Sequence, residues 1–251
     1  MNEGSRYALY FVPPADSALY RFGSSVLGYD CYTGGTLTHP DELVRDARAW
    51  HSMVDEPRRY GFHATLKAPF HLSSPCTEMQ LIGALENFAA SGHVIPVIAP
   101  VVRMLSGFAA ILSQQQEASL DALAANCTKA FDSFRAPISP QERARRIAAG
   151  LNQAQVENLD RWGYPFVFAD FRFHMTLTGR IAPTHVKPRS RCCGGASSGS
   201  VDMGLFRSTA WPCSNRNRRT RPFGSCVTRH YAPLAPRLLC VSTPMPCATR
   251  R

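Results

Sequence analysis

Two segments of this 251-residue chain share one pattern: an aromatic residue, a histidine, any residue, a threonine and a leucine. The first is Phe62-His63-Ala64-Thr65-Leu66-Lys67 and the second is Phe173-His174-Met175-Thr176-Leu177-Thr178. Composition alone predicts about 0.04 His-x-Thr-Leu matches in such a chain. A single match would suit a strand whose threonine is there for its β-propensity. Two matches with the same neighbours favour a function, so we predict His63 and His174 as catalytic residues.

A pair of histidines can supply both proton transfers of phosphodiester cleavage. One imidazole takes a proton from the attacking water or hydroxyl, and the other gives a proton to the leaving oxygen. An unperturbed pKa near ~6.5 allows one neutral and one protonated copy at neutral pH, and each transfer contributes about 10²–10⁴-fold in rate. Thr65 and Thr176 can donate hydrogen bonds to phosphate oxygens, and Lys67 and Arg172 can stabilise the developing charge. This chemistry needs no metal and no other cofactor, and the pattern leaves open which histidine is the acid.

Both motifs must be carried on strands if the histidines and threonines are to work together. Successive side chains of a strand point to opposite faces. Each motif then buries its aromatic, central and leucine residues and presents an imidazole beside a hydroxyl. We therefore expect strands at 59–72 and 171–180, with their polar rows facing one cavity if the strands lie side by side.

The remaining chain up to residue 181 alternates strand and helix patterns. Apolar runs between turn residues predict strands, and apolar residues at helical spacing after capping residues predict helices. The stretch 29–57, rich in Gly, Thr, Asp and Pro, is interpreted as mostly loop. The further expected strands cover 7–12, 94–104 and 108–112, and the expected helices cover 16–26, 77–90, 117–134, 152–162 and a segment that opens at 139.

Charge divides the chain into two parts. Residues 1–181 carry a net charge of −1, whereas residues 182–251 contain 12 Lys and Arg, one acid and a net charge of +11. The second part is also rich in Cys, Pro and Ser and shows only one strand-like run, from residue 237 to 241. We interpret 182–251 as a disordered tail or a frameshifted reading. A nonspecific nucleic-acid arm is the alternative, but no nucleic-acid fold or regular aromatic pattern supports it.

Location and partners follow from what the sequence lacks. No apolar run approaches the ~20 residues that cross a bilayer, and the first residues do not resemble a secretory signal. We therefore expect a cytoplasmic protein that binds a small phosphorylated substrate and no membrane. The charge of −1 on residues 1–181 argues against a long nucleic acid as partner, and the sequence gives no basis for an oligomeric state.

The paired motifs resemble those of the two-histidine phosphoesterase superfamily, which includes RNA 2′,3′-cyclic phosphodiesterases. The segments Arg58-Arg59-Tyr60-Gly61-Phe62-His63-Ala64-Thr65-Leu66-Lys67-Ala68-Pro69-Phe70 and Phe171-Arg172-Phe173-His174-Met175-Thr176-Leu177-Thr178-Gly179 are similar to a branch of phosphonate metabolism proteins, encoded near carbon–phosphorus lyase genes. The similarity covers about residues 5–181, and so defines a phosphoesterase-like domain at 1–181. It implies an α+β fold of two pseudo-symmetric lobes, with antiparallel sheets flanked by helices around a central cleft. Relatives continue with a helix and closing strands, so the last lobe is expected to be incomplete here.

The resemblance also implies an activity. His63 and His174 would be the acid and base, and Thr65 and Thr176 the phosphate ligands, in metal-independent hydrolysis of a small cyclic phosphate ester. The natural candidate is a phosphoribosyl cyclic phosphate from the carbon–phosphorus lyase route. An RNA 2′,3′-cyclic phosphodiesterase and a truncated, inactive binder of a phosphorylated ligand are the alternatives.

Arg59 and Tyr60 lead directly into the first motif. They are candidate substrate-binding residues, able to hold a second phosphate if they line the cleft. A solvated strand end describes them equally well.

Overall fold

The computed structural model of the protein describes residues 5–41, 43–44, 46–91, 98–181, 224–227 and 237–243. Its strands are β1 (Arg6–Val12), β2 (Tyr29–Asp30), β3 (Gly35–Thr36), β4 (Ala64–His71), β5 (Pro100–Leu105), β6 (Phe108–Ser113), β7 (Met175–Arg180), β8 (Gly224–Val227) and β9 (Arg237–Thr243). Its α-helices are α1 (Ala18–Leu27), α2 (Ala47–Arg58), α3 (Glu78–Ala90), α4 (Ala118–Ala130), α5 (Pro140–Ala148) and α6 (Gln153–Trp162). Short 3₁₀ turns cover η1 (Asp132–Phe134) and η2 (Phe168–Asp170).

One sheet carries both motifs, and its strand order is β5-β6-β7-β4-β1-β9-β8. Neighbouring strands run antiparallel, except that β8 and β9 are parallel. The two motif strands, β4 and β7, meet in the middle through a single residue pair, Ala64 and Met175. The sheet therefore consists of two antiparallel halves, β5-β6-β7 and β4-β1-β9-β8, joined at the motifs. The expected α+β class is confirmed.

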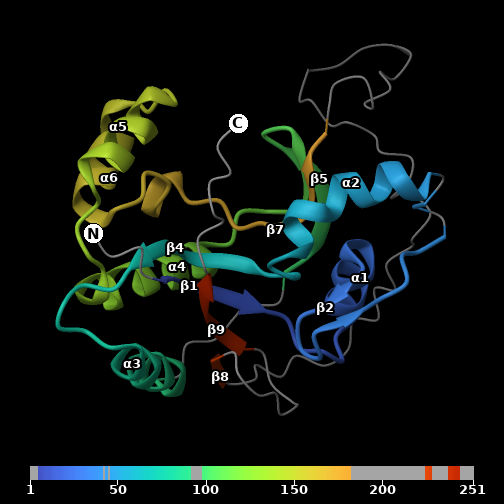
Figure 1. Cartoon of the computed structure of the whole chain (residues 1–251), viewed down its shortest axis with the longest axis horizontal. Helices are drawn as coiled ribbons and strands as arrows, with labels where there is room; N and C mark the ends of the chain where they lie inside the picture. The colour runs from blue at the N-terminus through green and yellow to red at the C-terminus, as the bar shows by residue number, and fades with distance from the viewer. Residues whose placement is uncertain are drawn as a thin grey trace.

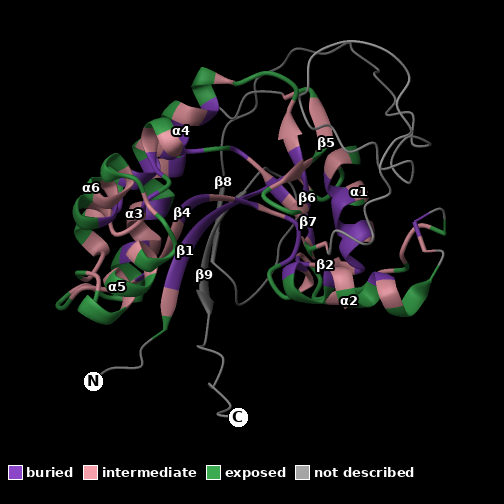
Figure 2. Ribbon diagram, turned by 90° about the horizontal axis from the view of Figure 1, so that it is seen from above, coloured by how far each residue is buried: buried purple, intermediate pink, exposed green. Residues whose placement is uncertain are grey.

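Helices cover the two halves from different sides. Helices α1 and α2 pack against β7, whereas α4 packs against β4 and α3 against β8 and β9. Figures 1 and 2 show the same division, with α1 and α2 on one side of the molecule, α3 to α6 on the other, and the strands between them. No described helix has the length and apolar character that a membrane-spanning helix requires.

The apolar faces of both motifs are in the core, as the alternation predicts. Phe62, Met175 and Leu177 are completely buried, and Ala64 and Leu66 nearly so. The histidine and threonine of each motif are only partly buried. Each fully buried side chain of this size stabilises the fold by about 1.5–3 kcal/mol, and this burial fixes which way the polar rows point.

The boundaries of several strands and helices differ from those predicted from the sequence. Both motif strands begin one residue after their histidine rather than several residues before it, because a turn precedes each one. The loop interpretation of 29–57 was wrong for residues 47–57, which belong to α2. Asp46 caps this helix by accepting hydrogen bonds from the backbone N–H groups of Arg48 and Ala49, and Trp50 and Val54 form its buried face. This capped amphipathic pattern directly follows the Gly- and Thr-rich stretch, whose composition concealed it.

The remaining predicted elements agree with the structure in type. The helix expected at 77–90 is α3, and the strands expected at 94–104 and 108–112 correspond to β5 and β6, which pair with each other. Residues 94–97 of the predicted strand lie outside the described residues. The interpretation of 182–251 as disordered or frameshifted also falls mostly outside them. The strand-like run at 237–241 is confirmed within β9, which pairs with β1 along its whole length.

Two helical glycines give a matched test of how tightly the first motif is packed. A Cβ atom at Gly23 of α1 would overlap ring atoms of Phe62, whereas a Cβ atom at Gly83 of α3 would meet nothing within 4 Å. We predict that Gly23→Ala lowers the free energy of unfolding by about 1–3 kcal/mol, measured by denaturant unfolding. Gly83→Ala should be neutral or stabilising by up to about 1 kcal/mol. Equal effects of the two substitutions would contradict this packing.

Candidate active site

The register of β4 and β7 brings the two motifs together around a local two-fold axis. Ala64 and Met175, the paired residues, are each the middle residue of a His-x-Thr motif. Antiparallel pairing then places His63 opposite Thr176 and Thr65 opposite His174. The two histidines lie on a diagonal of this square, for which Cα atoms are typically about 7–8 Å apart.

Two cavities on this face are each lined by the histidine of one motif and the threonine of the other. A cavity of about 350 Å³ is lined by His63 together with Thr176, and a second of about 410 Å³ is lined by His174 together with Thr65. Both cavities are also lined by Phe108, whose ring centroid lies 5.8 Å from that of His174. Each cavity thus combines the histidine of one motif with the threonine of the other, as the register requires.

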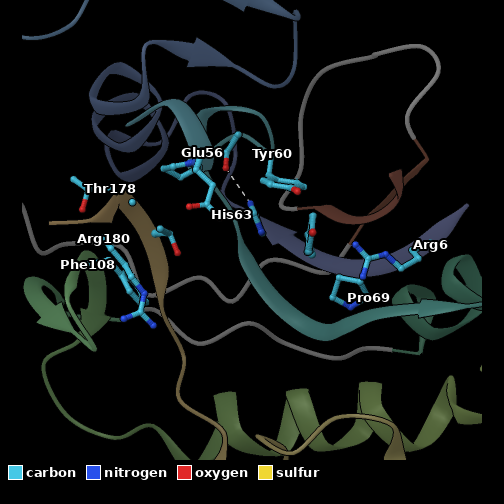
Figure 3. A pocket seen from close by; sticks show the side chains of 13 residues that line it. Arg6, Glu56, Tyr60, His63, Pro69, Phe108, Thr178 and Arg180 are labelled. Carbon is cyan, nitrogen blue, oxygen red and sulfur yellow. Dashed lines mark hydrogen bonds between the residues drawn. The ribbon is translucent and has the colours of Figure 1, made fainter. Parts of the chain in front are cut away.

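Both imidazoles are held by the same backbone contact. The Nδ1 atom of His63 lies 3.0 Å from the Gly61 carbonyl oxygen, and that of His174 lies 2.8 Å from the Arg172 carbonyl oxygen. A carbonyl oxygen can only accept a hydrogen bond, so Nδ1 carries the hydrogen in both rings. This leaves Nε2 of each histidine as the atom available for proton transfer. Figure 3 shows the His63 contact as a dashed line.

Gly61 positions the first histidine because it allows a turn between α2 and β4. Its φ of 71° lies in the left-handed region, which glycine adopts without strain. A Cβ atom at this position would also lie 2.6 Å from the Cβ atom of the buried Cys31. The chain can therefore turn tightly here and direct the Gly61 carbonyl at His63.

His63 is packed so that it stays neutral. Its ring stacks on Tyr10 with centroids 3.8 Å apart. The pKa of His63 is lowered to about 4, mainly by burial of the ring; the hydrogen bond to Gly61 opposes this shift and the charge of His174 adds to it. His63 is therefore neutral at neutral pH.

Lys67, expected beside the substrate, is not brought to either cavity. Its ammonium donates to the Thr128 carbonyl at 3.1 Å and lies 3.6 Å from Asp132. Burial lowers the pKa of Lys67 to about 8. The reason is a break in the β1–β4 register, where Leu66 is an extra residue between two paired positions. Such a bulge reverses the facing of the following side chains, so Lys67 turns toward α4.

The other predicted substrate-binding residues divide between cavity and surface. Tyr60 is 43% exposed and lines the cavity of His63. Arg172 lines the cavity of His174, but its guanidinium donates to the Ala169 and Phe171 carbonyls. Arg59 lines neither cavity; its guanidinium pairs with Asp55 at 2.7 Å on the exposed face of α2.

The sequence reasoning missed further lining residues, among them Arg6, Tyr10, Phe108 and Arg180. Arg6 and Tyr10 of β1 reach the cavity of His63, and Phe108 and Arg180 line both cavities. Figure 3 shows Arg6 on one side of His63 and Arg180 on the other. The four-residue spacing of Arg6 and Tyr10 places them on one face of a strand, a signal that was present in the sequence. Among the described residues, no group of three or more His, Cys, Asp or Glu is placed to hold a metal ion.

Comparison with models of protein families assigns the chain to one family. A model described as "Protein of unknown function (DUF1045)" matches residues 65–199, which include Thr65 and the whole second motif. The chain belongs to the DUF1045 family. No solved structure matched this DUF1045 protein.

Two curated relatives share a long segment with this DUF1045 protein. Both are named "Ribose 1,5-bisphosphate phosphokinase PhnN". The one from Janthinobacterium sp. (strain Marseille) is 39% identical over 177 residues, which is 70% of this chain and 39% of the relative. The one from Laribacter hongkongensis (strain HLHK9) is 33% identical over 178 residues, 70% of this chain and 40% of the relative. The DUF1045 chain thus spans about two fifths of the length of these relatives.

The neutral state of His63 predicts an acid-sensitive fold. Because its folded-state pKa is about 4 and its unfolded value is near ~6.5, the unfolded chain binds more protons between these values, and stability falls as the pH falls through this window. We predict that the melting temperature drops less between about pH 7 and about pH 5 in His63→Gln than in the unmodified protein. His71→Gln, which changes a histidine of β4 outside both cavities, should retain the full drop. Identical pH profiles of the unmodified protein and both variants would count against a His63 that is neutral in the folded state.

Proposed function

We propose that this protein is a metal-independent phosphodiesterase that hydrolyses a small cyclic phosphate ester between His63 and His174. The observation that carries the proposal is the Ala64–Met175 pair, because its register places two imidazoles diagonally across two threonines. The matching Nδ1 contacts, which leave both Nε2 atoms available, support the same conclusion.

The two histidines have different roles in the proposed reaction. His63 is neutral at neutral pH because its pKa is lowered to about 4, so it acts as the base and takes a proton from the attacking water at Nε2. The new P–O bond forms as the ring P–O bond breaks, and protonated His174 gives its Nε2 proton to the departing oxygen. The product is a phosphate monoester with a free hydroxyl. Exchange with solvent then restores both imidazoles.

Threonine hydroxyls and positive charge hold the phosphate in this proposal. Thr65 and Thr176 donate to the two non-bridging oxygens from opposite corners of the square. Arg180 lines both cavities, and no described carboxylate pairs with it. Its charge can therefore offset the charge that builds on phosphorus in the transition state.

A phosphorylated ribose is the substrate class that the relatives support. Their name contains ribose 1,5-bisphosphate, and a phosphoribosyl cyclic phosphate of phosphonate metabolism would yield a compound of that kind on hydrolysis. The phosphokinase part of the name belongs to proteins that extend well beyond the shared segment. The present sequence contains no Gly-x₄-Gly-Lys-Ser/Thr loop, which commonly holds nucleotide phosphates.

Substitution of either histidine tests the proposal. We predict that His63→Ala and His174→Ala each lower kcat for a cyclic sugar phosphate by at least about 10²-fold, followed as release of the monoester by ³¹P NMR. His51→Ala, which changes an exposed histidine of α2 outside both cavities, is the control and should keep full activity. Wild-type turnover that survives in either active-site variant would contradict the assignment.

The choice of substrate separates the alternatives. A cyclic ribose phosphate, a 2′,3′-cyclic mononucleotide and an RNA oligomer with a cyclic end should be compared under one condition. Preference for the sugar supports the proposal, and preference for the oligomer would favour an RNA phosphodiesterase instead. Binding of the sugar without turnover would identify an inactive binder.

Chelation gives an independent check on the mechanism. Because proton transfer is assigned to the two imidazoles alone, we predict that dialysis against EDTA leaves the rate of hydrolysis unchanged. Loss of activity that added divalent metal restores would overturn the metal-independent mechanism.

A further inference from the structure

Arg6, Tyr10 and Tyr60 form a polar group beside His63 that the proposed hydrolysis does not use. All three line the cavity of about 350 Å³. Burial raises the pKa of Tyr10 to about 12; Tyr60 also raises it, and the charge of Arg6 lowers it. We call them the Arg6 cluster. The Tyr10 ring also stacks on His63, which ties the cluster to the reacting side of the cavity.

The partly buried guanidinium of Arg6 has no ion-pair partner among the described residues. Its Nε atom is buried without a hydrogen-bond partner among the described residues. The acid whose pKa it lowers, Glu142, is already paired with Arg146 at 2.7 Å and with Arg145 at 3.4 Å. No described carboxylate lies within ion-pair distance of Arg6. A planar guanidinium in this condition is suited to bind a phosphate through two parallel N–H donors.

The carboxylate in the same cavity is on the other side of β4. Glu56 Oε2 would be 3.8 Å from a Cβ atom on Gly179, a residue of β7. Arg6 belongs to β1, on the other side of β4, where it lies opposite His71 in the strand register. Because β4 lies between β1 and β7 in the sheet, Glu56 and Arg6 are at different ends of the cavity. An anion held by Arg6 is therefore kept away from the repelling carboxylate.

We propose that the Arg6 cluster binds a second, non-reacting phosphate of the substrate. This inference rests on the proposed function and assigns the residues that would hold the terminal phosphate monoester of a sugar that also carries a cyclic phosphate. Arg6 supplies two N–H donors, and the hydroxyls of Tyr10 and Tyr60 supply further ones. Arg6 and Tyr10 are four residues apart on β1, about 13 Å between Cα atoms. This spacing leaves room for a sugar ring between the terminal phosphate at Arg6 and the reacting phosphate at His63.

Two substrates that differ in one group test the subsite. Ribose 1,2-cyclic phosphate and its 5-phosphorylated form should be compared by kcat/KM in the full chain. We expect the protein to prefer the phosphorylated substrate and Arg6→Met to lower this preference by about 10–100-fold, mainly through KM. The preference of Arg6→Lys should lie between those of the unmodified protein and Arg6→Met, because lysine keeps the charge and loses the paired N–H donors. Arg21→Met, an exposed arginine of α1, should keep the full preference.

Direct binding separates failure of the subsite from failure of the proposed function. Titration calorimetry with ribose 5-phosphate should show binding that Arg6→Met weakens by the same factor, and ribose should not bind. Equal melting temperatures show that the variants are folded. If Arg6→Met does not fold, Tyr60→Phe is used in its place, and we expect it to weaken ribose 5-phosphate binding by a smaller factor. An unchanged preference and unchanged ribose 5-phosphate affinity in Arg6→Met would overturn the subsite even if hydrolysis occurs. Arg6-dependent binding without any hydrolysis would support the subsite and overturn the proposed function.

Discussion

The pairing of Ala64 with Met175 is the contact on which the whole arrangement depends. It is the single pair that joins β4 to β7, and therefore the single pair that joins the two halves of the sheet. Because each residue is the centre of a His-x-Thr motif, a shift of one position would turn one motif toward the core. Both residues are almost completely buried, and α2 contacts β7 while α4 contacts β4. The geometry of the candidate site thus depends on the burial of this pair.

The backbone also determines how the two histidines are held. Each ring is fixed by a hydrogen bond from Nδ1 to the carbonyl two residues earlier in the chain, so the backbone that leads into each strand also selects the tautomer. The two environments are otherwise unlike. His63 stacks on Tyr10 and is held neutral by burial, whereas His174 lies near Phe108 in the second cavity. A symmetric frame with unequal surroundings can give two identical residues separate roles in acid–base chemistry.

The sequence predicted the parts of this site that depend on local pattern. Motif spacing identified the histidines and threonines, and strand alternation correctly separated their polar and buried faces. Lys67 could not be placed in this way, because a register break in β4 reverses its direction and only the paired strand reveals it. Arg6 and Tyr10 were missed because the sequence of β1 shows only a mainly apolar strand. Its pairing with β4, which brings these two side chains to the cavity of His63, is not visible in the sequence. The length of α2 was missed because its cap and buried face follow a loop-like composition.

The central claim is that His63 and His174 contact one phosphate from opposite corners of the paired motifs. NMR titration of histidine ring resonances with inorganic phosphate, which is the smallest probe of that site, tests it most directly. In the Arg6→Met variant, which lacks the proposed second phosphate subsite, we predict that the Nε2 resonances of His63 and His174 shift together with a single affinity, while the exposed His51 of α2 does not respond. Independent affinities for the two rings, or a response from only one of them, would contradict the account.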